Sequence, residues 1–394
     1  MRRQWLVTLI VVGLMLSGCI GPEFQDLDED GIEDSEDLDM DGDGWDNLVE
    51  IDCNSDPNNF DNVPNDLDND TVCDELDEDI DGDNLPNDWE SERGLDPRDS
   101  NDTLICHGFS EFCLRNYDNF TFPETHNAFA TSEDGVILGT NHYTGLQAQW
   151  DGGIRAFMVD AHHLREDQTE AEDVRFCHGS PGQFPHPCAY SEVDAFEWLS
   201  HLNSLMNLTS QECLSKCGNV VSILVENYVP AEHLEFLFNE TGILERAFIH
   251  QLGDSWPSIG DMILQKKDVV IYVQSEYNES FSYFHPAWKH SWDTPYGQQS
   301  KEEMTCELGR GDSNQPVWHL SNWLSSIFGT ADPYKAHEVN QYEFLLNRTI
   351  ECWEIMDNRP TFVAVDYWED GEITNVTITL NKMDNWDDEI PTHQ

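Results

Sequence analysis

Four apolar runs in the C-terminal part of the chain constrain its fold most strongly. Each is rich in β-branched residues and ends in a polar side chain: Ile154–Asp160, Val220–Glu226, Val269–Gln274 and Phe362–Asp366. Continuous apolar runs of this length are typical of strands that are buried on both faces of a parallel sheet. Segments with helical spacing, 192–206 and 231–238, lie between them. Strands and helices that alternate in this way predict an α/β fold, specifically a (β/α) barrel of the TIM type.

Polar residues at the ends of these runs are candidate catalytic residues, because barrel active sites lie at the carboxyl ends of the strands. Asp160, Glu226 and Asp366 each close one run. Two histidines lie in short motifs nearby, Thr125-His126-Asn127 and Cys177-His178-Gly179. Two imidazoles that face a carboxylate-held cation can cleave a phosphodiester. One takes the proton of a nucleophilic hydroxyl, and the other protonates the leaving oxygen.

The order and context of these motifs resemble the X domain of phosphatidylinositol-specific phospholipase C (PI-PLC). The resemblance is greatest to the short relatives that carry only the catalytic barrel. It extends from about Cys106 to the C-terminus and also includes residues 220–228, 254–257, 267–273 and 359–367. It implies that His126 is the general base, that His178 is the general acid, and that Asp366 fixes the tautomer of His126. It further implies that Asn127, Asp160 and Glu226 hold one divalent cation, Ca²⁺ or Mg²⁺.

The sequence departs from this family at one metal position. The calcium-dependent members carry a Glu two residues before the Asp, and this chain has Met158 there. The metal-free bacterial members carry an Arg where Asp160 stands. We therefore expect a metal-dependent site with one carboxylate fewer, which water or another acidic residue compensates. His162 and His163 follow Asp160 and are expected on a solvated loop.

An acidic repeat precedes the predicted barrel. Asp39, Asp41, Asp43 and Glu50 recur 40 residues later as Asp79, Asp81, Asp83 and Glu90. Carboxylates at positions 1, 3, 5 and 12 of a loop are the ligand pattern of a calcium site. Partial copies begin at Asp26 and Asp66. The loops lack the flanking amphipathic helices of an EF-hand and are similar to thrombospondin type 3 repeats, which implies structural Ca²⁺. The alternative is a disordered acidic stalk.

The N-terminus has the pattern of a lipoprotein signal peptide. Arg2 and Arg3 precede an apolar run that is too short for a confident membrane span. Residues 16–19, Leu-Ser-Gly-Cys, resemble a lipobox, which predicts lipid on Cys19; an ordinary signal peptide is the alternative. Ten further cysteines form an even set, as a disulfide framework in an exported protein requires. Cys106–Cys113 and Cys177–Cys188 are the simplest pairs.

The predicted organisation is a signal peptide (1–18), a linker (19–25), calcium-binding repeats (26–105) and a phosphodiesterase barrel (106–394). A formal net charge of -59 argues against a nucleic-acid binder and means that an anionic substrate needs bound cations. We expect an extracytoplasmic phosphoric diester hydrolase, anchored to the membrane surface by lipid, that acts on a phospholipid or another phosphodiester. The alternatives are a glycerophosphodiester or sphingolipid phosphodiesterase on the same barrel, and a non-catalytic calcium-dependent adhesion or scaffold protein.

Overall fold

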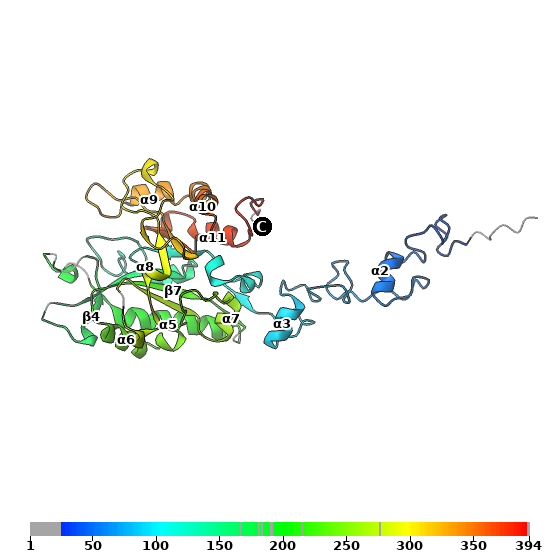
Figure 1. Ribbon diagram of the computed structural model, residues 1–394, viewed down its shortest axis with the longest axis horizontal. Coiled ribbons are helices and arrows are strands. Elements are labelled where there is room, and N and C mark those ends of the chain that lie inside the picture. The colour runs from blue at the N-terminus through cyan, green and yellow to red at the C-terminus, as the bar shows by residue number, and fades with distance from the viewer. Residues whose placement is uncertain are drawn as a thin grey trace, which may run out of the picture. The chain divides into compact units, whose positions relative to one another are not determined.

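The computed structural model describes residues 25–391, except residues 166, 180, 181, 183, 190, 191, 215 and 276. The chain divides into two compact units between Asp102 and Thr103. We call them the repeat unit and the C-terminal unit (Figure 1). In the described part of the chain, no helix is long and apolar enough to cross a membrane.

The repeat unit has almost no apolar core. Among its described residues, the buried apolar side chains are Cys53, Cys73 and Leu85. The disulfide between Cys53 and Cys73 joins the two copies of the repeat. Aspartate side chains shape the loops by accepting backbone N–H groups two residues on, as Asp28 does from Asp30. The unit is therefore held by polar loop contacts and a cross-link rather than by hydrophobic burial.

A short helix follows each acidic loop, although the sequence shows no flanking amphipathic helices of the EF-hand type. These helices are α2 (Asn47–Asp52) and α3 (Asn87–Arg93). Asp46 caps α2 by accepting the N–H of Leu48, and Gly94 ends α3 in the left-handed conformation. The loop-closing Glu50 and Glu90 lie inside these helices and are fully buried. The first helical turn after each loop therefore places its glutamate next to the loop aspartates.

The C-terminal unit is built around a curled eleven-stranded sheet, which confirms the predicted α/β class. Eight parallel strands follow one another around it in chain order, and the last, β13, pairs with the first, β2, for example Phe362 with Phe122. Their bounds are β2 Phe122–Thr125, β3 Ala156–His163, β7 Val221–Asn227, β8 Val269–Val273, β9 Phe284–Pro286, β10 Ser291–Asp293, β12 Val317–Ser321 and β13 Phe362–Val365. The antiparallel strands are β4 Val174–Phe176, β5 Val193–Asp194 and β11 Arg310–Gly311; β1 Ile105–Cys106 and β6 Cys217–Gly218 form a separate pair.

The sheet curls as the predicted TIM-type barrel does but is open on one side, because β9 and β10 stand at opposite ends of its parallel path and are not paired. The connection between them is α8 (Ala287–His290), a single helical turn. A crossover between neighbouring parallel strands needs about a dozen residues or more. This link is too short for that crossover, so the barrel opens at this point.

Helices pack around the outside of the curled sheet, with α5 to α7 below it and α9 to α11 above it in Figure 1. Their bounds are α4 Leu146–Asp151, α5 Ala195–Glu212, α6 Ala231–Glu240, α7 Ile259–Leu264, α9 Pro333–Val339, α10 Tyr342–Met356 and α11 Ile373–Asn381. In α5, Asp194 caps the first turn, and apolar residues at helical spacing, such as Trp198 and Leu202, are buried. Trp198 meets Phe157 of β3 edge to face, 5.5 Å between ring centres.

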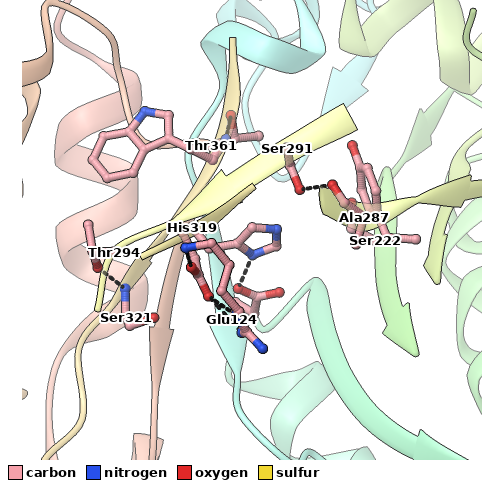
Figure 2. A network of polar contacts seen from close by, with 12 residues as sticks. Glu124, Ser222, Ala287, Ser291, Thr294, His319, Ser321 and Thr361 are labelled. Carbon is pink, nitrogen blue, oxygen red and sulfur yellow. Dashed lines mark hydrogen bonds and ion pairs between the residues drawn. The ribbon is translucent and has the colours of Figure 1, made fainter. Parts of the chain in front are cut away.

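Alternate strand residues face opposite sides of the sheet, and this alternation positions the site. Phe157 and Val159 of β3 join the hydrophobic core under the helices, whereas Met158 and Asp160 line a cavity. A buried pair, Glu124 of β2 and His319 of β12, lies inside the curled sheet, with 2.8 Å between Glu124 Oε2 and His319 Nδ1. Figure 2 shows this pair beside the hydrogen bond from the Ser321 N–H to Thr294.

Candidate active site

One cavity of about 320 Å³ contains the whole set of predicted barrel site residues. His126, Asn127, Asp160, His178, Glu226 and Asp366 all line it. They come from four strands or the loops that directly follow them, β2, β3 with its hairpin partner β4, β7 and β13. Residues separated by up to 240 positions thus meet at one end of the sheet.

His126 follows β2 and is fixed through its backbone and its ring. Its N–H donates to the carbonyl of Val365 at the end of β13. Its Nδ1 lies 3.0 Å from Oδ1 of Asp366, and because a carboxylate only accepts, Nδ1 carries the proton. In the neutral ring Nε2 then has a lone pair, which accepts from the Asn127 amide at 3.2 Å. Trp323 stacks on the ring, 4.3 Å between centres and 11° from parallel.

Asp366 is itself held from a second direction. The Nδ2 of Asn141 donates to Asp366 Oδ1 at 2.6 Å, and Asp366 is only 2% exposed. Burial acts to lower the pKa of His126, but the charge and hydrogen bond of Asp366, together with Asp160 and Glu226, raise it above its ordinary value. The carboxylate environment of the cavity thus favours the protonated imidazole.

Asp160 and Glu226 stand side by side, because β3 and β7 pair in register at these two residues. Burial first, and then the charge of Glu226, raise the pKa of Asp160 well above its ordinary value. Tyr228 donates to Glu226 Oε2 at 3.0 Å. Arg310, the basic side chain that lines the cavity, is already bonded to Asp293 through Nε, 2.9 Å away. Two adjacent carboxylates without a cationic side chain of their own fit a divalent cation with oxygen ligands.

Asn127 suits the same cation. It adopts a left-handed conformation with φ of 50°, which is rare for residues other than glycine and is tolerated by asparagine. Its Nδ2 is used by His126, which leaves the amide oxygen as a ligand. Met158 lines the cavity two residues before Asp160, and the equivalent β7 position is Leu224. The cavity thus offers two carboxylates and one amide for a cation.

His178 lies on the loop after β4, and neighbouring segments hold this loop. The disulfide Cys177–Cys188 begins beside it, and the Gly179 N–H donates to Asp160. Burial, and then the charge of His126, lower the pKa of His178, although a hydrogen bond to the backbone of Gly139 partly offsets this. The environments of the two histidines therefore shift their pKa values in opposite directions.

The expected solvated loop after Asp160 is wrong. His162 and His163 belong to β3, and His162 is only 4% exposed. The Nε2 of His162 donates to the carbonyl of Gly179 at 2.9 Å, and burial lowers its pKa to about 4. The antiparallel strand β4 extends the pairing of β3 beyond Asp160, and His162 is buried there. His162 is thus a support for the loop that carries His178.

Several cavity residues carry no sequence signal that singles them out. Trp323 and Asn141 contact His126 and Asp366 from long loops, and Tyr296 and Arg310 come from the segment around the β10–β11 pair. Tyr228 has a weak signal, because it lies two residues beyond Glu226, directly after the same strand. The folded conformation of the loops brings these residues to the site, and no local sequence pattern marks them.

The repeat unit contains the second set of candidate metal ligands. Carboxylate oxygens of Asp39, Asp41 and Asp43 lie within 4.8 Å of one another, and the same holds for Asp79, Asp81 and Asp83. The two partial copies, at Asp26 and Asp66, also bring three carboxylates together. Fully buried Glu90 has no hydrogen-bond partner on either carboxylate oxygen, and burial together with the neighbouring aspartates raises its pKa to about 7. Buried acceptors that converge in this way fit a calcium ion.

The disulfides include both predicted pairs, Cys106–Cys113 and Cys177–Cys188. The remaining ones are Cys53–Cys73, Cys213–Cys217 and Cys306–Cys352. All ten cysteines outside the N-terminal segment are therefore bonded, as the even count suggested. Cys19, the predicted lipidation site, lies outside the described residues.

Comparison with known proteins identifies relatives of the C-terminal unit. The family model described as PI-PLC X 1 matches residues 112–381, well over half of the chain. The chain is 25% identical over 297 residues to a PI-PLC X domain-containing protein 1 of Arthroderma benhamiae, covering 71% of this chain and 90% of the relative. It is 22% identical over 319 residues to an uncharacterized secreted protein of the same organism, covering 74% and 67%. Among solved structures, the phosphatidylinositol-specific phospholipase C of Listeria monocytogenes aligns with a TM-score of 0.43 and 12% identity over 68% of this chain and 94% of that one.

Proposed function

The chain belongs to the PI-PLC X family, and on that premise we propose that it is a phosphoric diester hydrolase of the phosphatidylinositol-specific phospholipase C type. The observation that carries this proposal is the single cavity that His126 and His178 share with Asp160 and Glu226. A pair of histidines beside two carboxylates provides both proton-transfer groups and a cation site for cleavage of a phosphodiester.

The proposed reaction is an internal attack by a neighbouring hydroxyl of the head group on phosphorus. His126 Nε2 takes the hydroxyl proton, and Asp366 holds the opposite edge of the ring and stabilises the imidazolium that forms. The new P–O bond closes a cyclic phosphate, and the P–O bond to the leaving alcohol breaks. His178 gives its proton to that oxygen; its ring is oriented by the Gly139 backbone. From a phospholipid whose head group carries such a hydroxyl, the products are a cyclic phosphate and diacylglycerol.

A divalent cation would be held by Asn127, Asp160 and Glu226, and it would offset negative charge on the phosphoryl oxygens. It would also offset the charges of Asp160 and Glu226, which add to the larger effect of Asp366 in raising the pKa of His126. This matters because a general base must be unprotonated at the working pH. With the carboxylates neutralised by a cation, His126 suits the role of base better than its surroundings otherwise allow.

A non-catalytic adhesion role would explain the repeats and would leave the cavity unexplained. Release of diacylglycerol from a total lipid extract, with and without a chelator, tests the enzymatic proposal. We expect release that depends on added Ca²⁺ or Mg²⁺. If no lipid in the extract is cleaved under either condition, and no soluble phosphodiester is cleaved, the proposal is refuted.

We also propose that the repeats bind structural Ca²⁺ and that the mature protein is a lipoprotein outside the cytoplasm. Five disulfides in the chain support an exported location, and one relative is described as a secreted protein. Lipid on Cys19 would place the barrel at a membrane surface. One acyl chain binds membranes only marginally, so stable anchoring requires two or more. The mass of the mature N-terminal peptide tests this: an unmodified Cys19 would refute the anchor.

A further inference from the structure

A small cavity of about 60 Å³ lies at the amino ends of the strands, away from the active site. Arg155, which directly precedes β3, and Asn219, two residues before β7, line it. Thr374 and Asn381 of α11 and His107, just after β1, complete its polar lining. The strands are parallel, so their amino ends point away from the carboxyl ends that form the active site. The two cavities share no lining residue.

The guanidinium of Arg155 has no carboxylate partner in this cavity. It lies 3.9 Å above the ring of Trp150, and its Nη1 donates to the carbonyls of Trp150 and Ile154, at 2.7 and 2.8 Å. Its Nε is buried and has no hydrogen-bond partner in the described part of the chain. Burial lowers the pKa of Arg155 to about 9, and the charge of Asp151 only partly offsets this. A buried charge without a partner of opposite sign is costly.

Two further groups in the cavity can donate hydrogen bonds. The Nε2 of His107 accepts the N–H of Val220 at 3.1 Å, so in the neutral ring Nδ1 carries the proton. Burial, and then the charge of Arg155, lower the pKa of His107 well below its ordinary value, so the ring is neutral at pH 7. The amide of Asn219, a residue only 7% exposed, makes no hydrogen bond to another described side chain.

The lining also lacks acceptors that carry charge. No Asp or Glu is among the described residues that line this cavity, although the formal net charge of the chain is -59. Elsewhere, buried guanidinium groups are paired with carboxylates, as Arg246 is with Asp268. A cationic donor and two neutral donors around a space without carboxylates are suited to an anion.

We propose that this cavity binds one small monovalent anion, chloride in particular, between Arg155, His107 and Asn219. A volume of about 60 Å³ is enough for one such ion and too small for a nucleotide or a lipid head group. Because folding alone brings the three donors together, the ion stabilises the folded C-terminal unit. The inference goes beyond the proposed function and does not depend on it, since no proposed catalytic residue lines the cavity.

The test compares thermal unfolding of the C-terminal unit within the parent chain in sodium chloride and in sodium isethionate, which supplies a bulkier anion. Calcium and ionic strength are kept equal, so that screening of the acidic repeats is the same in both salts. Above the dissociation constant, each tenfold rise in chloride should raise the Tm by roughly 2–4 °C. The same Tm in both salts at every concentration would overturn the proposal.

Two variants assign the effect to the cavity. Arg155→Gln removes the cation, and Asn219→Asp places a carboxylate of nearly the same shape where the anion would bind. Both should abolish the difference between the two salts. The matched control is Arg359→Gln, because Arg359 also lies over a tryptophan, 4.2 Å from the ring centre of Trp353, with an unpartnered Nε among the described residues, but does not line this cavity. It should keep the chloride dependence.

A chloride dependence that persists in full in Arg155→Gln and Asn219→Asp would overturn the proposal. A second measurement needs no variant and covers poor folding of any of them. Crystals of the parent chain grown in sodium bromide should show an anomalous scattering peak beside the Arg155 guanidinium. Water alone at that position, with no anomalous peak, would overturn the proposal.

Discussion

At the scale of single residues, the site is defined by how firmly His126 is held. Asp366 binds one edge of the ring, Asn127 contacts the other, and Trp323 covers a face. Asn141 in turn holds Asp366. A ring restrained on three sides keeps one tautomer and one orientation, which is what proton transfer to a positioned substrate requires.

The first prediction concerns the two histidines. His126→Ala and His178→Ala should each lower turnover by about 10²-fold or more, the usual contribution of one acid–base group. The measurement is the initial rate of diacylglycerol release, with thermal unfolding to show that the fold persists. His201→Ala is the control, because His201 is exposed and bonds to Gln147. Near parental rates in either cavity variant would remove the proposed mechanism.

The second prediction concerns Asp366. In Asp366→Asn the side chain no longer requires a proton on Nδ1 of His126, so the wrong tautomer becomes populated. Loss of such a supporting carboxylate typically costs 10- to 100-fold in activity, and the pH–rate profile should move as well, because Asp366 raises the pKa of His126. An Asp366→Asn enzyme with an unchanged pH–rate profile would show that this contact does not act on His126.

At the scale of elements, each acidic loop of the repeat unit is followed by a short helix that supplies the last candidate calcium ligand, Glu50 in α2 and Glu90 in α3. Glu90 in α3 is fully buried, whereas Glu92 two residues later has a side chain that is 77% exposed. Both belong to the same helix, so they differ in position relative to the loop rather than in local structure. Substitutions at Glu90 and Glu92 therefore change the net charge equally, but only the first removes a candidate calcium ligand.

The third prediction follows from this pair. Calcium should bind the repeats with a dissociation constant of about 10⁻⁴–10⁻³ M, as in extracellular modules. Glu90→Gln should weaken binding at the second loop, and Glu92→Gln should not. Isothermal titration of each variant measures this, with protease digestion in a chelator as a second readout. Equal weakening by both substitutions would mean that the loops attract calcium through net charge alone.

The sequence predicts elements better than it predicts the way they close. Asp160, Glu226 and Asp366 could be placed correctly because each is tied to the end of an apolar strand, and strand ends meet at one edge of a parallel sheet. The open seam beside α8 could not be foreseen, because it depends on the length of one link. Trp323 and Asn141 were missed because loop conformation, and no local pattern, brings them to His126.

At the scale of the whole molecule, the two units are stabilised by different interactions. The repeat unit has few buried apolar residues and a high density of carboxylates, whereas the C-terminal unit has a continuous core. Removal of calcium should therefore open the repeats and leave the barrel folded. Acid should act on the barrel through its buried neutral histidines.

The fourth prediction is this acid sensitivity. Burial, followed by the charges of His290 and His250, lowers the pKa of His285 to about 3. Because this is below the unfolded value of about 6.5, the unfolded chain binds more protons, and stability falls as pH drops from 6.5 toward 4. The contribution of His285 to this fall is at most about 3 kcal/mol at pH 4.

Urea unfolding of the parent chain and of His285→Gln, at pH 7 and pH 4, measures that contribution. The variant should lose less stability between the two pH values than the parent chain does. Both proteins carry the same carboxylates, so the difference between their pH dependences reports on His285 and its interaction with His290 and His250. An identical pH dependence would show that His285 takes up its proton without cost in the folded state.

The most direct test of the central claim, cleavage by two histidines through internal attack, is ³¹P NMR of phosphatidylinositol during incubation with the parent chain. We predict that a five-membered cyclic phosphate appears as the first phosphorus product, together with diacylglycerol, and that neither forms with His126→Ala or His178→Ala. A phosphate monoester that appears first, with its new oxygen drawn from water, would contradict cleavage by internal attack.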